Sequence, residues 1–458
     1  MEIAKTLLDK YNVAVPRYTS YPPANYFGPM NEAGFREMIV ASNKAYPQHI
    51  AFYIHIPFCT KICHYCGCNA LSLGKGSQVK PYIDALKREM AMVLPLIDHS
   101  RLVSQIHFGG GTPNAIEPEY LAEIVAIIKS EFQFIEDPEI AIECNPAWLG
   151  EEAVRALKKA GFNRFSLGIQ DFDNRVLKLV NREPSALPVG DLIALLKDGN
   201  GAISVNLDFI YGLPGQTAAS FAHTICQAAA LRPDRLVTFS YAHVPWMKKH
   251  QSILERYGLP AADEKMAMFL EAYRILQSEG YCHLGFDHFV LPGDELNQAY
   301  QSHLLHGIFQ GCCGRRTTGQ VYAFGVSSIS QFAGGYAQNV KGLADYMQTI
   351  GKDVLPVEKG MILSSEQQTT REIINELMCN RVIDWNTIST LVNIDAGELR
   401  KKYIRDNQVF IDFEADGLIH YTGETIRVTE QGALFMRNIA AALDPTFVPS
   451  EQKHSNAV

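Results

Sequence analysis

The chain has 458 residues, a formal net charge of −8 and 47% hydrophobic residues. This length suits a barrel-sized domain plus a smaller module, and the acidic total excludes a general attraction to nucleic acid. The first residues lack the apolar segment of a signal peptide, and no run approaches the roughly 18 apolar residues of a membrane span. We therefore expect a cytoplasmic globular protein with neither nucleic acid nor a membrane as its partner.

Residues 1–45 are predicted to form an arm that precedes the main domain. Within it, residues 15–23 read Val-Pro-Arg-Tyr-Thr-Ser-Tyr-Pro-Pro, and the prolines favour extended backbone over helix. Such an arm is either a strap packed on the main domain or a lid over its site. Composition alone does not choose between the two.

Short β-rich runs and helix-length amphipathic segments alternate through residues 46–310. The predicted strands lie at 52–56, 104–108, 139–143, 164–168, 204–210, 235–240 and 282–286. The predicted helices lie at 81–94, 117–131, 151–160, 218–230 and 262–278. This order is typical of repeated β-α units around a parallel sheet. It predicts an α/β protein with a partial TIM-like (β/α)6 barrel.

Three cysteines, Cys59, Cys63 and Cys66, follow the first predicted strand on one short loop. Three thiolates can hold three irons of a 4Fe-4S cube and leave the fourth iron open for chemistry, unlike the closed spacing of ferredoxins. Ten cysteines without a signal peptide also favour a reducing compartment over disulfides. The alternative is a zinc site whose fourth ligand comes from one of three neighbours: His55, His64 or Cys68.

Glycines and polar residues collect just after the predicted strands, where parallel barrels bind their ligands. The second strand is followed by glycines at 109–111, which let backbone amides approach a ligand. Glu143, Gln170 and Asp208 stand at the ends of the next three strands. Carboxylates and amides at such positions suit ribose hydroxyls and an amino group, and the alternative is capping of the helices that follow.

Residues 311–458 are predicted to form a mainly helical domain with a small β-hairpin. Its helices are expected at 366–379, 385–392 and 396–406, and its hairpin across 419–428 with Gly423 in the turn. Helices followed by a hairpin resemble a winged helix, with phosphate contacts from Arg400, Lys401, Lys402 and Arg405. The acidic total favours a structural cap on the barrel instead.

The cysteine loop and its flanks resemble the radical S-adenosylmethionine (SAM) superfamily. A more specific resemblance, to oxygen-independent coproporphyrinogen III oxidases, runs from about residue 15 to the end of the chain. The motifs that carry it lie at 17–22, 53–59, 66–69, 108–113, 168–172, 180–183, 208–214 and 287–289. This resemblance implies oxidative decarboxylation of two propionates of coproporphyrinogen III to vinyl groups, which gives protoporphyrinogen IX in anaerobic haem biosynthesis.

The resemblance also implies cofactors and site residues. Cys59, Cys63 and Cys66 would hold a 4Fe-4S cluster beside two SAM molecules, with an electron donor of flavodoxin or ferredoxin type and a monomeric chain. The implied SAM contacts are Tyr53, Gly110, Gly111, Thr112, Glu143, Gln170, Arg182, Asp208, Ala242, Gln310 and Ile329. The candidates for catalytic roles are Tyr53, His55 and Cys68. For His55 the alternative is a core histidine, and for Cys68 a small buried thiol.

One loop departs from the family pattern. After Gln310 and Gly311 the family commonly has a tyrosine, whereas this chain has Cys312 and Cys313, which puts contacts to the second SAM and the substrate in doubt. Because coproporphyrinogen carries four carboxylates, its site needs cations. The candidates are Arg17, Arg315 and Arg316.

Three other functions remain open. A haem chaperone of the same superfamily typically lacks the arm around Arg17 and has a bulky residue in place of Cys68, so both features count against it. A haem-opening methyltransferase of the same branch is the second alternative. The third is a cluster-bearing sensor that uses its C-terminal module to reach nucleic acid. Such a sensor would have no need of the set Glu143, Gln170, Arg182 and Asp208.

Overall fold

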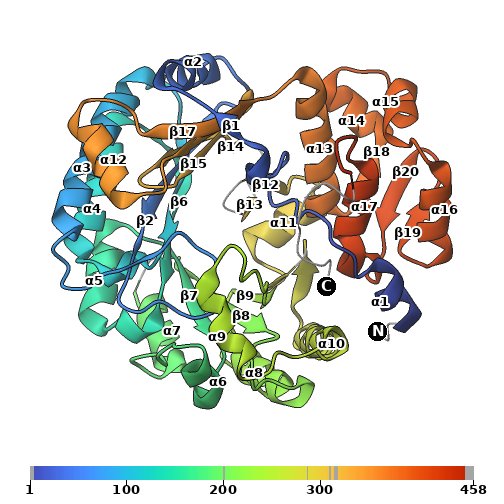
Figure 1. The fold of residues 1–458 in the computed structure, drawn as a ribbon, viewed down its shortest axis with the longest axis horizontal. Helices are drawn as coiled ribbons and strands as arrows, with labels where there is room; N and C mark the ends of the chain where they lie inside the picture. Colours follow the sequence, from blue (N-terminus) through green and yellow to red (C-terminus); the bar gives the residue numbers. More distant parts are fainter. Residues whose placement is uncertain (1–4, 200–201, 286, 309–310, 314–317, 449–458) are drawn as a thin grey trace.

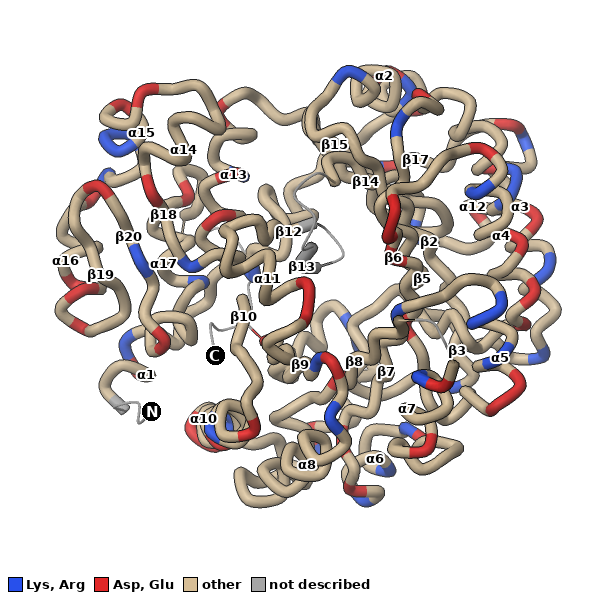
Figure 2. The backbone as a smooth tube through the Cα atoms, turned by 180° about the vertical axis from the view of Figure 1, so that it is seen from behind, with Lys and Arg blue, Asp and Glu red and all other residues tan. Residues whose placement is uncertain are grey.

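The computed structural model describes residues 5–199, 202–285, 287–308, 311–313 and 318–448. Figure 1 shows a curved sheet surrounded by helices, with a smaller module of helices, in orange and red, beside it. No helix in the described ranges is long and apolar enough to cross a bilayer. Acidic and basic residues are intermixed on the helices around the sheet (Figure 2).

The main sheet contains six consecutive parallel strands, as the alternating pattern predicts. They are β2 (His49–Ile56), β5 (Val103–Gly110), β6 (Phe134–Cys144), β7 (Arg164–Gln170), β8 (Ser204–Tyr211) and β9 (Arg235–Ser240). Large side chains of these strands, such as Phe52, Phe108 and Phe165, are fully buried. The parallel register brings the carboxyl ends of all six strands to one edge of the barrel.

Helices cover the outer face of these strands (Figure 1). They are α3 (Val79–Val93), α4 (Pro118–Glu131), α5 (Glu151–Ala160), α6 (Asn174–Leu179), α7 (Val189–Lys197), α8 (Ala218–Ala230) and α10 (Ala262–Ser278). α5 illustrates why they form where they do. It begins with Glu151 and Glu152, buries Val154 and Leu157, and ends at Gly161 in a left-handed conformation. The (β/α)6 barrel is therefore present, and α6 and α7 are helices that the sequence pattern did not reveal.

The strand predicted at 282–286 does not pair as a seventh parallel strand. β10 (Cys282–Leu284) pairs antiparallel with β11 (His288–Val290), which pairs antiparallel with β9. β10 therefore has the direction of the parallel strands but does not pair with β9. The prediction that it continues the parallel pairing is wrong because the short link from β10 to β11 allows only an antiparallel pair, whereas a parallel crossover needs a dozen or more residues.

The sheet also extends past residue 310, where we placed the end of the barrel. β14 (Thr318–Phe324) runs parallel to β2 on the side away from β5. β15 (Ile329–Phe332), β16 (Gly335–Asn339) and β17 (Val357–Ile362) continue the sheet antiparallel. The prediction that residues 311–458 are mainly helical is therefore wrong for this stretch.

The C-terminal module has the predicted helices and hairpin. Its elements are α13 (Ser365–Asn380), β18 (Val382–Asp384), α14 (Trp385–Val392), α15 (Ala396–Tyr403), α16 (Asn407–Ala415), β19 (Ile419–Tyr421), β20 (Thr425–Val428) and α17 (Met436–Leu443). Gly423 lies in the hairpin turn with a φ of 79°. Trp385, Tyr403 and Phe435 are buried between the elements. α16 and α17 were not predicted.

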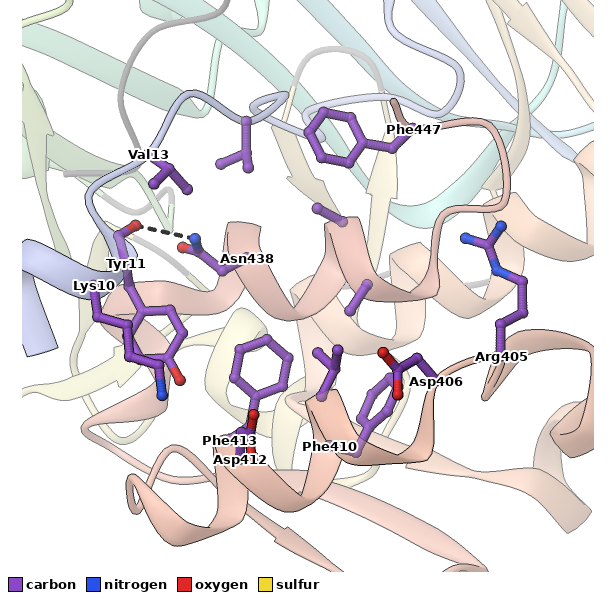
Figure 3. Close-up of a pocket in the computed structure, with 14 residues that line it drawn as sticks. Lys10, Tyr11, Val13, Arg405, Asp406, Phe410, Asp412, Phe413, Asn438 and Phe447 are labelled. Atoms are coloured by element: carbon purple, nitrogen blue, oxygen red, sulfur yellow. Dashed lines mark hydrogen bonds between the residues drawn. The ribbon is translucent and has the colours of Figure 1, made fainter. Parts of the chain in front are cut away.

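The N-terminal arm links this module to the sheet. Its helix α1 (Lys5–Tyr11) packs Tyr11 against Phe413 and Phe435, with ring centroids 5.6 and 5.5 Å apart. The backbone carbonyl of Tyr11 accepts a hydrogen bond from Asn438 at 3.0 Å, across a pocket of about 420 Å³ (Figure 3). Further along, β1 (Gly28–Pro29) pairs with β17. Both ends of the arm are thus packed against the rest of the chain.

Candidate active site

The cysteine loop begins where β2 ends, at β3 (Phe58–Cys59). Cys59 Sγ lies 3.2 Å from Thr112 Oγ1, and Cys63 Sγ accepts a hydrogen bond from Arg182 at 3.5 Å. The neighbouring thiol of Cys68 lowers the pKa of Cys66. Each of the three predicted cluster cysteines therefore has a polar neighbour from the barrel or the loop itself.

The three cysteines of the loop offer a set of thiolate donors. Ligands of one zinc ion converge on one point, whereas a cube takes each cysteine at a different corner. The thiolate donor set also matches what iron–sulfur clusters require.

Two distant segments hold the cysteine loop by its backbone carbonyls. Asn181 donates to Ile62 at 2.8 Å. After β9, three side chains donate to loop carbonyls: Lys248 to Cys68 at 2.7 Å, His250 to Cys66 at 2.9 Å and Gln251 to Tyr65 at 2.8 Å. Sequence reasoning missed these residues because hydrogen bonds to backbone carbonyls leave no pattern in the sequence.

The glycines at 109–111 bring protein groups together rather than leaving an open cradle. A Cβ on Gly109 would lie 2.8 Å from Glu143 Oε1, and a Cβ on Gly111 would lie 2.6 Å from Pro57 O. Gly110 has a φ of 116°, and a Cβ there would lie 2.7 Å from the ring of His55. Glycine is needed because the barrel edge and the cysteine loop meet at this point.

A chain of polar side chains crosses from β2 to β6 beside these glycines. Tyr53 stacks on His107 with ring centroids 5.8 Å apart, and His107 Nε2 lies 3.0 Å from Glu143 Oε1. Burial alone would raise the pKa of Glu143, but the hydrogen bond and charge of His107 and the Gly110 N–H keep it below its usual value. His107 was not predicted, because its place opposite Tyr53 depends on the register between two strands of the folded sheet.

His55 is buried between the Tyr53 hydroxyl, 3.3 Å from Nδ1, and the Asn69 carbonyl, 3.2 Å from Nε2. Burial lowers the pKa of His55 and raises that of Tyr53 well above its usual value. Both rings are therefore neutral at pH 7, and they suit hydrogen bonding rather than charge pairing.

The ends of β7 and β8 carry the other predicted ligand contacts. Asp208 accepts hydrogen bonds from Ser166 at 2.8 Å and from Asn206 at 2.7 Å, and burial raises its pKa to about 6. Gln170 has a φ of 70°, and its buried Oε1 has no hydrogen-bond partner among the described residues. An orphaned acceptor of this kind needs a donor, such as the amino group or ribose hydroxyls of SAM.

Comparison with known proteins agrees with this geometry. Residues 53–226 match the Radical SAM superfamily, and residues 363–435 match the HemN C-terminal domain. An oxygen-independent coproporphyrinogen III oxidase of Synechocystis is 37% identical over 99% of this chain and 97% of its own length. That of Escherichia coli is 36% identical over 96% of this chain and 94% of its own length. The chain belongs to the oxygen-independent coproporphyrinogen III oxidase family.

A solved member of the oxidase family has the same fold. Coproporphyrinogen III oxidase (HemN) from Escherichia coli superposes with a TM-score of 0.88 at 33% identity, over 98% of this chain and all of that one. The predicted α/β radical SAM barrel is therefore confirmed. Membership of the superfamily gives the chain its cofactors, a 4Fe-4S cluster and SAM. The three thiols fit the cluster, and the unpartnered Gln170 Oε1 fits SAM.

The oxidase has a cavity of about 680 Å³ beside the cysteine loop. Its walls are residues 15–20 and 23–25 of the arm, residues 65–68 of the loop, and residues that end or follow β8 and β9, including Ala242. Cys68 is exposed here, so the alternative of a small buried thiol is wrong. Arg17 also lines the cavity.

Some predicted residues lie elsewhere or outside the described residues. Ile329 begins β15 and packs with Phe27, Tyr336 and Leu363. Cys312 and Cys313 belong to β13 (Gly311–Cys313), which pairs with β12 (His306–Ile308). Three residues fall outside the described residues: Gln310, Arg315 and Arg316.

Proposed function

We propose that the chain catalyses oxidative decarboxylation of two propionates of coproporphyrinogen III to vinyl groups, giving protoporphyrinogen IX in anaerobic haem biosynthesis. The observation that carries this proposal is the cavity of about 680 Å³ whose wall includes Cys66 and Cys68. A substrate held there lies directly against the loop that binds the cluster. The relatives that match almost the whole chain are named for this reaction.

When bound, the cluster and SAM supply a carbon radical that removes one hydrogen atom from a propionate. Each propionate then loses carbon dioxide and passes one electron to an acceptor, which leaves a vinyl group. The chain holds its cofactors through Cys59, Cys63 and Cys66 and through Glu143, Gln170 and Asp208. Tyr241 and Trp246 give the cavity aromatic walls against which a tetrapyrrole can pack.

We extend the proposal to the finer features of the family. Because two propionates react, a second SAM molecule would serve the second of them. Tyr53, His55 and Cys68 are the candidates for catalytic roles, and Cys68 is the one that lines the cavity. A flavodoxin or ferredoxin type donor, a monomeric chain and a cytoplasmic location complete the proposal.

The test is anaerobic turnover. The reconstituted holoenzyme, given SAM, a strong reductant and coproporphyrinogen III, should form protoporphyrinogen IX and about two 5′-deoxyadenosines per product. Cys68→Ser should retain its iron but lose product formation, whereas Cys226→Ser, an exposed cysteine on α8, should match the wild type.

Two results would contradict the proposal. Deoxyadenosine without protoporphyrinogen would move the search to another tetrapyrrole. If a protein with an intact cluster forms neither deoxyadenosine nor protoporphyrinogen, this result would favour the haem chaperone or the sensor.

A further inference from the structure

The cavity beside the cysteine loop has an unbalanced positive charge. Among its described lining residues, Arg17 is the only charged one, and the rest are apolar, aromatic or neutral polar. Arg17 is exposed to this space. Side chains such as Phe239, Trp246 and Met247 are also exposed there, at 37%, 52% and 71%. A ligand that suits these walls has a large apolar body and at least one anionic group.

A second cation, Lys265, lies behind the wall of the same cavity, against a residue that lines it. Lys265 is in the first turn of α10 and its methylenes lie across Gly212, where a Cβ would be 2.9–3.0 Å from them. Lys265 Nζ donates to the carbonyl of Tyr241 at 3.2 Å, and Tyr241 lines the cavity. An ammonium group has three donors, so this one bond leaves capacity for a ligand. Among the described residues Lys265 has no ion pair with a carboxylate.

A third cation, Arg437 of α17, holds the arm by its backbone carbonyls. Its guanidinium donates to the carbonyl of Pro16 at 3.0 Å and to that of Val15, the two residues before Arg17. Arg437 is buried. It therefore determines where the backbone of Arg17 lies relative to the cavity.

The positive charges of Arg17, Lys265 and Arg437 repel one another, and this repulsion favours binding of an anion between them. Burial, and then the charge of Arg17, lowers the pKa of Lys265 to about 8 and that of Arg437 to about 9. The carboxylates near this region are engaged by other groups: Asp287 lies 2.7 Å from His288, Asp444 accepts from the hydroxyl of Tyr18 at 3.0 Å, and Glu255 lies 2.9 Å from His243. A bound carboxylate would relieve the repulsion between the cations.

We propose that Arg17 and Lys265 together bind one propionate carboxylate of the substrate, and that Arg437 is a positioning residue for Arg17. This inference rests on the proposed function. A carboxylate paired with cations is stabilised in its charged form, which opposes loss of carbon dioxide. The site therefore suits a propionate that the reaction leaves intact, and the product, which keeps two propionates, should use it as well.

The experiment measures the affinity of the anaerobic holoenzyme for coproporphyrin III, a stable porphyrin with four propionates, by fluorescence quenching. Lys265→Met and Arg17→Met should each weaken binding roughly 10- to 100-fold, the range expected for hydrogen bonds to charged groups. Lys265→Arg should retain most of the affinity. Lys80→Met, which removes an exposed lysine of α3, is the matched control and should leave the affinity unchanged.

Two further measurements separate a carboxylate site from a merely structural role. The tetramethyl ester of coproporphyrin III has no carboxylates, so its affinity should change less than twofold in Lys265→Met. In an Arg17→Met background, Arg437→Met should add little further loss, because the residue that it positions is already gone.

Unchanged coproporphyrin III affinity in Lys265→Met, or equal losses for the acid and its ester, would overturn the inference. This result is distinct from failure of the proposed function. If the wild type turns over coproporphyrinogen III while the variants bind like the wild type, only the cation site is wrong. If the wild type gives no protoporphyrinogen, the proposed function fails, and tighter binding of the acid than of the ester would still locate an anion site.

Discussion

A buried carboxylate outside the active site makes a quantitative prediction about stability. Glu89 of α3 is 1% exposed. It accepts hydrogen bonds from the Gly325 N–H at 2.8 Å, from Asn339 at 2.6 Å and from the hydroxyl of Tyr346 on α12 (Leu343–Gly351). Burial raises the pKa of Glu89 from 4.5 to about 7 despite these bonds. Glu89 therefore joins α3 to the strands that follow β14, in its protonated form below pH 7.

The sign of the pH dependence follows from this raised pKa. Below pH 4.5 both the folded and the unfolded chain hold the proton, and the contribution of Glu89 to stability is fully present. Between pH 4.5 and pH 7 the unfolded chain releases the proton while the folded chain keeps it, so stability falls as the pH rises. A shift from 4.5 to about 7 corresponds to a loss of about 3 kcal/mol.

The Glu89→Gln variant should remove this dependence, because an amide imitates the protonated acid. For 458 residues the unfolding entropy is about 1 kcal/mol/K, so the loss corresponds to about 3 °C in Tm. We expect the Tm of the wild type to fall by about 2–3 °C relative to the variant between pH 5 and pH 8, as measured by anaerobic scanning calorimetry. Glu119→Gln, an exposed glutamate of α4, is the control and should run parallel to the wild type. Parallel curves for Glu89→Gln and wild type would refute the reasoning.

Three further predictions concern the cluster, the glycine run and a buried ion pair. Cys63→Ala should lose most of its iron and sulfide after anaerobic reconstitution, and full retention would remove Cys63 from the cluster. Gly110→Ala should lower the stability by about 1–3 kcal/mol and weaken SAM binding in equilibrium dialysis, because its φ of 116° and the ring of His55 leave no room for a Cβ; normal binding would contradict this. Asp294→Asn should lower the free energy of unfolding by about 1–3 kcal/mol, because Arg235, only 4% exposed, loses the carboxylate at 2.7 Å and keeps only Glu295 at 3.2 Å; an unchanged midpoint in urea denaturation would contradict it.

Local sequence patterns were sufficient for most of the barrel. The helices expected at 151–160, 218–230 and 262–278 have those bounds in the structure. Their apolar residues recur at a helical period, and that period depends only on neighbours along the chain. The strand at 282–284 exists as well, but its place in the sheet was wrong: β11 lies between it and β9, because its partner depends on the turn that follows rather than on the strand's own pattern.

In the site, too, some residues could be predicted from local sequence patterns and others only from the folded structure. Cys59, Cys63 and Cys66 could be found because their spacing on one loop is itself the signal. His107 could not, since its importance comes from facing Tyr53 and Glu143 on neighbouring strands. Lys265 could not be found either, because its role depends on Gly212 and Tyr241 from other β-α units.

By itself the sequence determined the β-α order, the cysteine loop and the family resemblance, since each depends on residues close together in the chain or on motifs of fixed spacing. Only the tertiary structure decided where the cavity lies and which charges face it. Arg437 donates to Pro16 across 421 residues of sequence, and no local pattern specifies such a contact. It forms because the arm and α17 pack together once the whole chain is folded, and that packing places Arg17 beside the cysteine loop.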